Sequence, residues 1–228
     1  MTSTANIPVL TIDGPSGSGK GTIARRVAEQ LGWHLLDSGA LYRLTGLAAQ
    51  ERGVSDPAAL GELAANLDIR FGSDSRGEEQ VWLNGADVTA GLRTEDTGRL
   101  ASGVAKVAEV REALVELQRG FRQLPGLVAD GRDMGTNIFP DAPLKVFLTA
   151  SAEERAKRRY KQLRDKGIDV SLAALSRDIE ARDRQDSQRA VAPLRPADDA
   201  RELDSSHLTI DEVADTVMRW ATERYLTN

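Results

Sequence analysis

The segment Gly14–Thr22, which reads Gly-Pro-Ser-Gly-Ser-Gly-Lys-Gly-Thr, limits the possible folds of this chain more than any other segment. It follows a strand-like run, Ile7 to Ile12, and leads into a helix-like run, Ala24 to Leu31. Glycines let the backbone curl until consecutive N–H groups point at one anion, and the helix N-terminus behind them adds partial positive charge. The segment therefore predicts a phosphate-binding P-loop, in which Lys20 reaches the β- and γ-phosphates of a nucleoside triphosphate. The residues expected to bind ATP are Gly14, Pro15, Ser16, Gly17, Ser18, Gly19, Lys20, Gly21 and Thr22.

The P-loop departs from the standard pattern G-x-x-x-x-G-K-[ST] at one position. Gly21 stands where Ser or Thr is usual, and Thr22 follows one residue later, so the hydroxyl that would serve Mg²⁺ is displaced. A Gly-Lys-Gly-Thr ending is typical of nucleoside monophosphate kinases and less typical of GTPases or ATPase motors. We expect Mg²⁺ as the cofactor, with Thr22 and Asp130 as its protein ligands, partly through water.

Composition narrows the class of protein. The chain has 228 residues, of which 40% are apolar, enough for one large domain or for a domain with an insertion. Its net charge of −5 disfavours a general nucleic-acid binder, and the absence of cysteine excludes disulfides and thiolate chemistry. Met1–Asn6 has no apolar signal core, and no run approaches the roughly 20 apolar residues of a membrane helix. We expect a soluble, cytoplasmic monomer with neither nucleic acid nor membrane as a partner.

Hydrophobic patterning predicts an α/β fold. Buried strands are expected at 9–12, 33–36, 127–130 and 144–148, with helices at 24–31, 40–50, 153–166 and 172–184 between or after them. A last strand is expected at His207–Ile210, before a helix capped by Asp211. Such βαβ units favour a parallel sheet with ligands at the carboxyl ends of the strands.

The middle of the chain has a different pattern. Residues alternate between apolar and polar at 67–71 and again at 81–83. Asn84-Gly85 then separates 81–83 from 86–88, which is the strongest short signal for a β-hairpin, and helical spacing resumes from Glu95 to Leu124. We expect a P-loop three-layer fold with a central parallel sheet, in which residues 1–61 and 96–228 form the kinase core. Residues 62–95 would form a small antiparallel β lobe on the side where the acceptor of the phosphoryl group binds. An arginine-bearing helical lid would lie near 153–190.

Polar residues follow two of the predicted strands. Asp130 at the end of the third strand can organise Mg²⁺, Arg132 can bind a phosphate, and Asp133 can accept from an amino group of a base. Ser38, Tyr42 and Arg43 follow the second strand and could project into one acceptor-binding crevice, where Tyr42 and Arg43 suit a phosphate. The alternative for the first group is a turn held by a local Arg–Asp pair, and for the second a helix N-cap at Ser38 with a solvated Arg43.

Arginines are dense in the predicted lid. Arg155, Arg158 and Arg159 share one helical face, and a second cluster runs from Arg182 to Arg189. A solvated helix face is the alternative, but phosphoryl transfer needs cations that neutralise the transferring group. The two histidines, His34 and His207, lie in strand-like runs and are expected to be structural. No dedicated base is expected, because an acceptor phosphate is already anionic near neutral pH.

Taken together, several segments resemble the bacterial cytidylate kinases, a family of P-loop nucleoside monophosphate kinases. The resembling segments are 11–22, Trp33–Arg43, Val110–Leu114, Leu127–Gly135 and Arg189–Leu194, and they spread over nearly the whole length. The resemblance implies transfer of the ATP γ-phosphoryl group to CMP or dCMP with Mg²⁺. The rivals are a kinase for another small acceptor, such as UMP or shikimate, and a nucleotide-dependent switch without turnover.

The resemblance also implies a role for each residue of the acceptor site. Ser102, Arg111 and Asp133 would read the base, and Arg182 and Asp186 would contact the sugar. Tyr42, Arg43, Arg132 and Arg189 would hold the acceptor phosphate. The residues expected to be catalytic are Lys20, Arg132, Arg155 and Arg159. One departure is visible, because Gln185 and Ser187 stand where relatives often carry further arginines.

Overall fold

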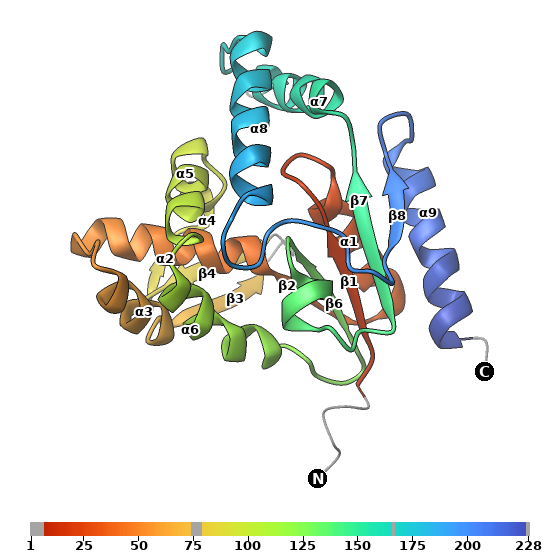
Figure 1. Cartoon of the computed structure of the whole chain (residues 1–228), viewed down its shortest axis with the longest axis horizontal. Helices are drawn as coiled ribbons and strands as arrows, with labels where there is room; N and C mark the ends of the chain where they lie inside the picture. The colour runs from red at the N-terminus through yellow and green to blue at the C-terminus, as the bar shows by residue number, and fades with distance from the viewer. Residues whose placement is uncertain (1–6, 74–78, 166, 227–228) are drawn as a thin grey trace. The chain divides into compact units, whose positions relative to one another are not determined.

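The computed structural model describes residues 7–73, 79–165 and 167–226 and divides into two compact units (Figure 1). The first unit joins Met1–Leu36 to Phe121–Asn228, and the second is Asp37–Gly120. The expectation for Met1–Asn6 lies outside the described residues. Among the helices that are described, none is long and apolar enough to cross a bilayer.

A five-stranded sheet organises the first unit, in the order β2-β6-β1-β7-β8. Strand β1 pairs in parallel with β6 and β7, and β7 pairs in parallel with β8. This arrangement confirms the predicted α/β fold with a central parallel sheet. The strands are β1 (Val9–Asp13), β2 (His34–Asp37), β6 (Leu127–Gly131), β7 (Leu144–Thr149) and β8 (Arg201–Asp204).

Helices α1 and α9 pack against one another beside this sheet, and their apolar faces build the core of the first unit. Leu10 and Ile12 of β1 are fully buried there, with Val27 of α1 and Val217 of α9. The helices of this unit are α1 (Lys20–Leu31), η2 (Met134–Ile138), α7 (Ala152–Asp165), α8 (Leu172–Ser187), α9 (Ile210–Ala221) and η3 (Thr222–Leu226).

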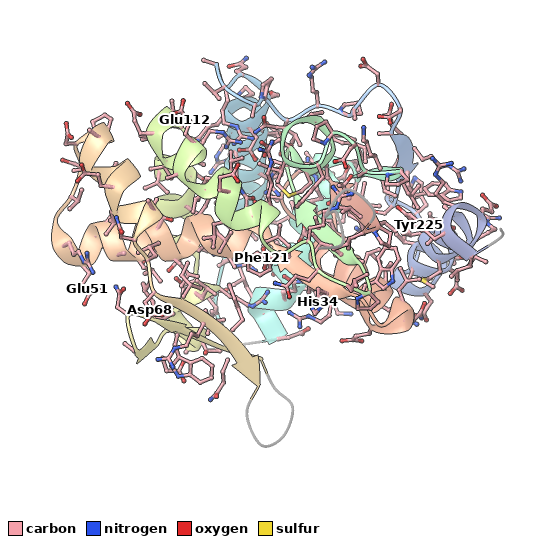
Figure 2. The ribbon with its side chains drawn as sticks, turned by 90° about the horizontal axis from the view of Figure 1, so that it is seen from below. His34, Glu51, Asp68, Glu112, Phe121 and Tyr225 are labelled. Carbon is pink, nitrogen blue, oxygen red and sulfur yellow. The ribbon has the colours of Figure 1, made fainter. Side chains whose placement is uncertain are left out.

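Two aromatic residues close the core near the start of β1. The hydroxyl of Tyr225, labelled in Figure 2, donates to the carbonyl oxygen of Val9 at 2.7 Å. The ring of Tyr225 also meets that of Trp33 edge to face, with the centroids 5.1 Å apart. The C-terminal turn is therefore fastened to the first residue of β1, at the opposite end of that strand from the P-loop.

Helices dominate the second unit, and two glycines let them approach closely. A Cβ at Gly46 of α2 would lie 2.8 Å from the Cβ of Leu100 in α5, and one at Gly61 of α3 would lie 2.8 Å from the Cβ of Glu109 in α6. Larger residues at these positions would force the helices apart. The helices are α2 (Ser38–Arg52), α3 (Pro57–Ala65), α4 (Thr89–Leu92), α5 (Glu95–Val104) and α6 (Ala108–Arg119).

A small antiparallel sheet, β3-β4-β5, lies in the same unit and confirms the predicted antiparallel insertion. Its strands are β3 (Ile69–Ser73), β4 (Glu79–Leu83) and β5 (Ala86–Asp87). Asn84 and Gly85 form the hairpin turn with φ angles of 50° and 83°, as a two-residue turn of this type requires. The boundaries of the predicted lobe, 62–95, stay a prediction, and residues 74–78 within it lie outside the described residues.

Three expectations for secondary structure are wrong. The last strand is β8, not His207–Ile210, because β8 is a polar edge strand that needs only backbone pairing and carries no apolar run. His207 is exposed in a turn. Thr209, not Asp211, caps α9, in a reciprocal capping box with Glu212. The helical stretch from Glu95 to Leu124 is two helices: α5 ends at Val104, one residue after Gly103, and α6 runs from Ala108 to Arg119.

Candidate active site

The predicted P-loop connects the buried end of β1 to helix α1. A Cβ at Gly14 would lie only 2.1 Å from the carbonyl oxygen of Leu148 in β7, so only glycine fits where the loop leaves the sheet. Gly19 precedes α1 with a φ angle of 92°, in the left-handed region, and no side chain in the described part of the chain caps the helix there. The first N–H groups of α1 thus form the kind of helix N-terminus that receives an anion.

Lys20 is the first residue of α1 and its side chain folds back over the loop. Its Nζ donates to the carbonyl oxygen of Pro15 at 3.1 Å, and the residue is 8% exposed. A buried ammonium group held at the loop is in position to neutralise phosphate charge. The geometry agrees with the expectation for Lys20, although its role stays a prediction.

Asp130, at the end of β6, lies next to the start of α1. A Cβ at Gly21 would be 3.1 Å from Oδ2 of Asp130, so a side chain at that position would crowd the carboxylate. Thr22 is exposed in the first turn of α1. No group of three or more His, Cys, Asp or Glu side chains among the described residues is placed to hold a metal ion. The single carboxylate of Asp130 next to the P-loop suits Mg²⁺, which commonly takes one or two carboxylates and completes its shell with phosphate and water.

Three predicted acceptor residues of the first unit, all arginines, lie around a fourth, Asp186. Its buried carboxylate accepts from Nε of Arg132 at 3.0 Å, and its backbone carbonyl accepts from Nε of Arg189 at 3.2 Å. Burial alone would raise the pKa of Asp186, but the guanidinium groups of Arg132, Arg189 and Arg182 hold it below its usual value. We call Arg132, Arg182, Asp186 and Arg189 the acceptor cluster. It concentrates three cations around one carboxylate, which leaves net positive charge for an anionic ligand.

Asp133, the neighbour of Arg132, is 2% exposed and accepts from Nδ2 of Asn137 at 3.2 Å. The chain beyond it is held by Asp13, whose carboxylate accepts from the backbone N–H groups of Met134 and Gly135, each at 2.8 Å. Burial raises the pKa of Asp13 to about 6, against the opposing effect of those two N–H groups. Sequence reasoning did not single out Asp13. The available signal was an acidic residue closing a strand whose other residues pack inside the protein.

Two of the predicted lid arginines contact the backbone of the P-loop. Arg155 of α7 donates to the carbonyl oxygen of Ser16 at 3.0 Å, and Arg158 donates to that of Ser18 at 3.4 Å. Arg158 also donates to the hydroxyl of Ser205, which follows β8, at 3.2 Å. Arg159 donates to Oε1 of Gln162 at 3.3 Å. Arg155 and Arg158 therefore brace the P-loop, which sequence reasoning did not foresee.

The remaining predicted acceptor residues belong to the second unit. The guanidinium carbon of Arg111 lies 5.6 Å from the ring centroid of Tyr42, a cation–π contact that brings two of them together. Arg43 donates to the carbonyl oxygens of Leu92 and Thr94 at 2.9 and 3.2 Å.

The two predicted serines of this unit bond within it. Ser102 donates to the carbonyl oxygen of Gly98 at 3.0 Å. Ser38 donates to Oε1 of Gln118 at 2.6 Å, and the N-cap of α2 is Asp37, not Ser38. In this structure the buried hydroxyl of Ser38 thus bonds within the unit.

Comparison with known proteins finds one family whose members are similar to this chain over most of its length. Residues 10–223 match the family model described as cytidylate kinase. A curated cytidylate kinase from Methylococcus capsulatus is 61% identical over 209 residues, which cover 91% of this chain and 93% of that protein. One from Aeromonas salmonicida is 57% identical over 219 residues, covering 95% of each. Among solved structures, a shikimate kinase from Acinetobacter baumannii aligns over 98% of this chain and 97% of its own at 18% identity, with a TM-score of 0.42.

Proposed function

The chain belongs to the cytidylate kinase family, and we propose that it transfers the γ-phosphoryl group of ATP to CMP or dCMP, forming ADP and CDP or dCDP. The observation that carries the proposal is the family match over residues 10–223, which include the P-loop and the acceptor cluster. The donor and acceptor parts of the site support it in different ways.

The P-loop is the proposed ATP site. The backbone N–H groups of residues 14–22 would bind the phosphates, and Lys20 would neutralise charge on the β- and γ-phosphates. Asp130 and Thr22 would hold Mg²⁺, partly through water, and the ion would supply further charge neutralisation at the phosphates. A side chain at position 21 would crowd the carboxylate of Asp130, so glycine stands there and the hydroxyl of the motif follows one residue later, at Thr22. This explanation of the displaced hydroxyl supports the assignment.

The acceptor cluster is the proposed site for the nucleoside monophosphate. Arg132 and Arg189, with Tyr42 and Arg43, would bind the acceptor phosphate, and Arg182 and Asp186 would contact the sugar. Ser102, Arg111 and Asp133 would read cytosine, and Ser38 would line the site. The buried carboxylate of Asp133 suits the amino group that distinguishes cytosine from uracil, because a carboxylate accepts hydrogen bonds and an amino group donates them.

The chemistry needs positioning and charge neutralisation more than proton transfer. An acceptor phosphate already carries the attacking oxygen as an anion, so these residues need only align it with the γ-phosphate and compensate the charge. Arg132, Arg155 and Arg159 are the proposed cations for this role, together with Lys20. We also propose that the protein acts as a cytoplasmic monomer, with the lobe of residues 62–95 on the acceptor side.

Release of ADP from Mg-ATP, measured with CMP, dCMP, UMP, AMP, GMP and shikimate as acceptors, tests the proposal. Turnover confined largely to CMP and dCMP is expected. Turnover with UMP or shikimate instead would keep the ATP site and reject the cytosine assignment. Slow turnover with every acceptor, together with ATP-dependent binding of a partner, would point to a nucleotide-dependent switch.

A further inference from the structure

Asp13 joins the two halves of the catalytic machinery in the first unit. It is the last residue of β1, immediately before the P-loop, and its carboxylate is hydrogen-bonded to the start of η2, immediately after Asp133. We infer that Asp13 is a positioning residue for the acceptor site, which fixes the chain at 131–135 and thereby sets where Arg132 and Asp133 lie. The inference rests on the roles proposed above for those two residues.

Both oxygens of the carboxylate are used. Oδ1 accepts from the N–H of Met134 and Oδ2 accepts from the N–H of Gly135, each at 2.8 Å. Two bonds from consecutive N–H groups to one rigid carboxylate fix the orientation of the peptide as well as its distance. Hydrogen bonds to a charged acceptor are also stronger than those to a neutral one.

The surrounding packing leaves this segment little freedom to shift. A Cβ at Gly135 would lie 2.9 Å from Oγ1 of Thr11 in β1 and 3.1 Å from Cδ of Lys145 in β7. A Cβ at Gly131 would lie 2.7 Å from Cγ of Met134. The segment therefore lies tightly against the sheet, and Asp13 supplies the polar contact that holds its first turn there.

Charge links Asp13 to both parts of the site. Among the described residues, the charged groups that act on it are Asp133 and Lys20. Asp13 thus lies within electrostatic range of the proposed base-reading carboxylate and of the P-loop lysine. Its own carboxylate faces the backbone rather than the ligand, so its effect on catalysis would pass through the segment it holds.

Asp13→Asn is the most informative variant, because an amide keeps the shape but has only one acceptor oxygen. Its NH₂ group would face one of the two backbone donors, so one hydrogen bond is lost and the segment must shift. We expect the KM for CMP to rise about tenfold or more while the KM for ATP changes less than about threefold. The preference for CMP over UMP should fall at the same time.

Tyr225→Phe provides the matched control. It also removes one hydrogen bond to β1, but at Val9, the opposite end of the strand from Asp13. Both KM values and the base preference should stay at their wild-type levels in this variant. An Asp13→Asn enzyme that folds but changes the two KM values equally, or neither, would overturn the inference.

A second measurement needs no variant. In the wild-type chain without nucleotide, the amide hydrogens of Met134 and Gly135 should exchange slowly, because Asp13 already holds them. Fast exchange that becomes slow only on addition of CMP would show that the ligand orders the segment, and would overturn the inference. The ADP-release assay of wild-type protein with the six acceptors tests the proposed function independently of this inference. If another acceptor is preferred there, the KM for that acceptor takes the place of the KM for CMP.

Discussion

The guanidinium group of Arg155 donates to both carboxylate oxygens of Asp183, which ties helix α7 to helix α8. Its other N–H groups donate to the carbonyl oxygens of Ala150 and Ser16, and Arg155 is only 4% exposed. One arginine therefore connects the end of β7, the P-loop and both helices of the predicted lid. The arginine that we propose to act on the transferring phosphate is thus oriented by four hydrogen bonds to protein groups.

Substitution of Asp183 tests the importance of this connection. Asp183→Asn leaves the buried guanidinium group without its opposite charge, and removal of one partner of a buried ion pair costs about 3 kcal/mol. We expect a free energy of unfolding lower by about that amount and a kcat lower by about tenfold, because Arg155 loses its orientation. Glu180→Gln on the same helix is the control, since its pair with Arg184 is exposed and 4.0 Å long. Equal unfolding energies and kcat values for the two variants would contradict the expectation.

Asp183 and Asp13 also show which contacts of the site could not be predicted from the sequence. The P-loop could be predicted because its chemistry demands particular residues at a fixed spacing, between a strand and a helix. The hydrogen bond of Asp13 joins it to a backbone N–H 121 residues away, and no sequence pattern records a backbone partner. Asp183 stood inside a charge-rich run where nothing marked it as the partner of Arg155. Strand β8 and the cap at Thr209 were missed for the related reason that pairing at a sheet edge and capping leave weak patterns in the sequence.

Gly21→Ala tests whether Asp130 serves the metal ion. The added methyl group would lie 3.1 Å from Oδ2 of Asp130, so the carboxylate must move. We expect the Mg²⁺ concentration for half-maximal activity to rise about threefold or more, with a smaller effect on the KM for CMP. Gly91→Ala in α4 adds the same methyl group where nothing lies within 4 Å, and its Mg²⁺ requirement should match the wild type. An unchanged requirement in Gly21→Ala would count against Asp130 as a ligand.

Lys20→Ala should remove most of the activity. The ammonium group is buried at the P-loop, where loss of a single charge-stabilising donor typically costs about 100-fold to 1,000-fold in kcat. Steady-state turnover of CMP, with circular dichroism to verify folding, measures the effect. Lys157→Ala is the control, because Lys157 is exposed and pairs only with Glu153 among the described residues. Near-normal turnover by folded Lys20→Ala would reject the proposed role.

Asp133→Ala should relax the choice of base. If the buried carboxylate accepts from the amino group of cytosine, its loss removes the contact that UMP cannot make. We expect the ratio of kcat/KM for CMP to that for UMP to fall by about tenfold or more. Asn137→Ala is the matched control, because it removes the 3.2 Å bond to Asp133 but leaves the carboxylate in place. A ratio that is unchanged in Asp133→Ala, or that falls equally in both variants, would show that another residue selects the base.

Asp13 should make the stability of the chain depend on pH. Its pKa is raised by burial from 3.8 to about 6, so between these values the folded chain binds more protons than the unfolded chain. The free energy of unfolding then falls as the pH rises through this range, by about 3 kcal/mol in total. The contribution is fully present below pH 3.8 and lost above pH 6. In Asp13→Asn it is absent, while the groups that do not interact with Asp13 act alike in both proteins. Urea unfolding between about pH 4 and pH 7 should therefore show that wild type loses stability relative to the variant as the pH rises. A difference that stays constant over this range, or grows in favour of wild type, would show that the buried carboxylate titrates outside it.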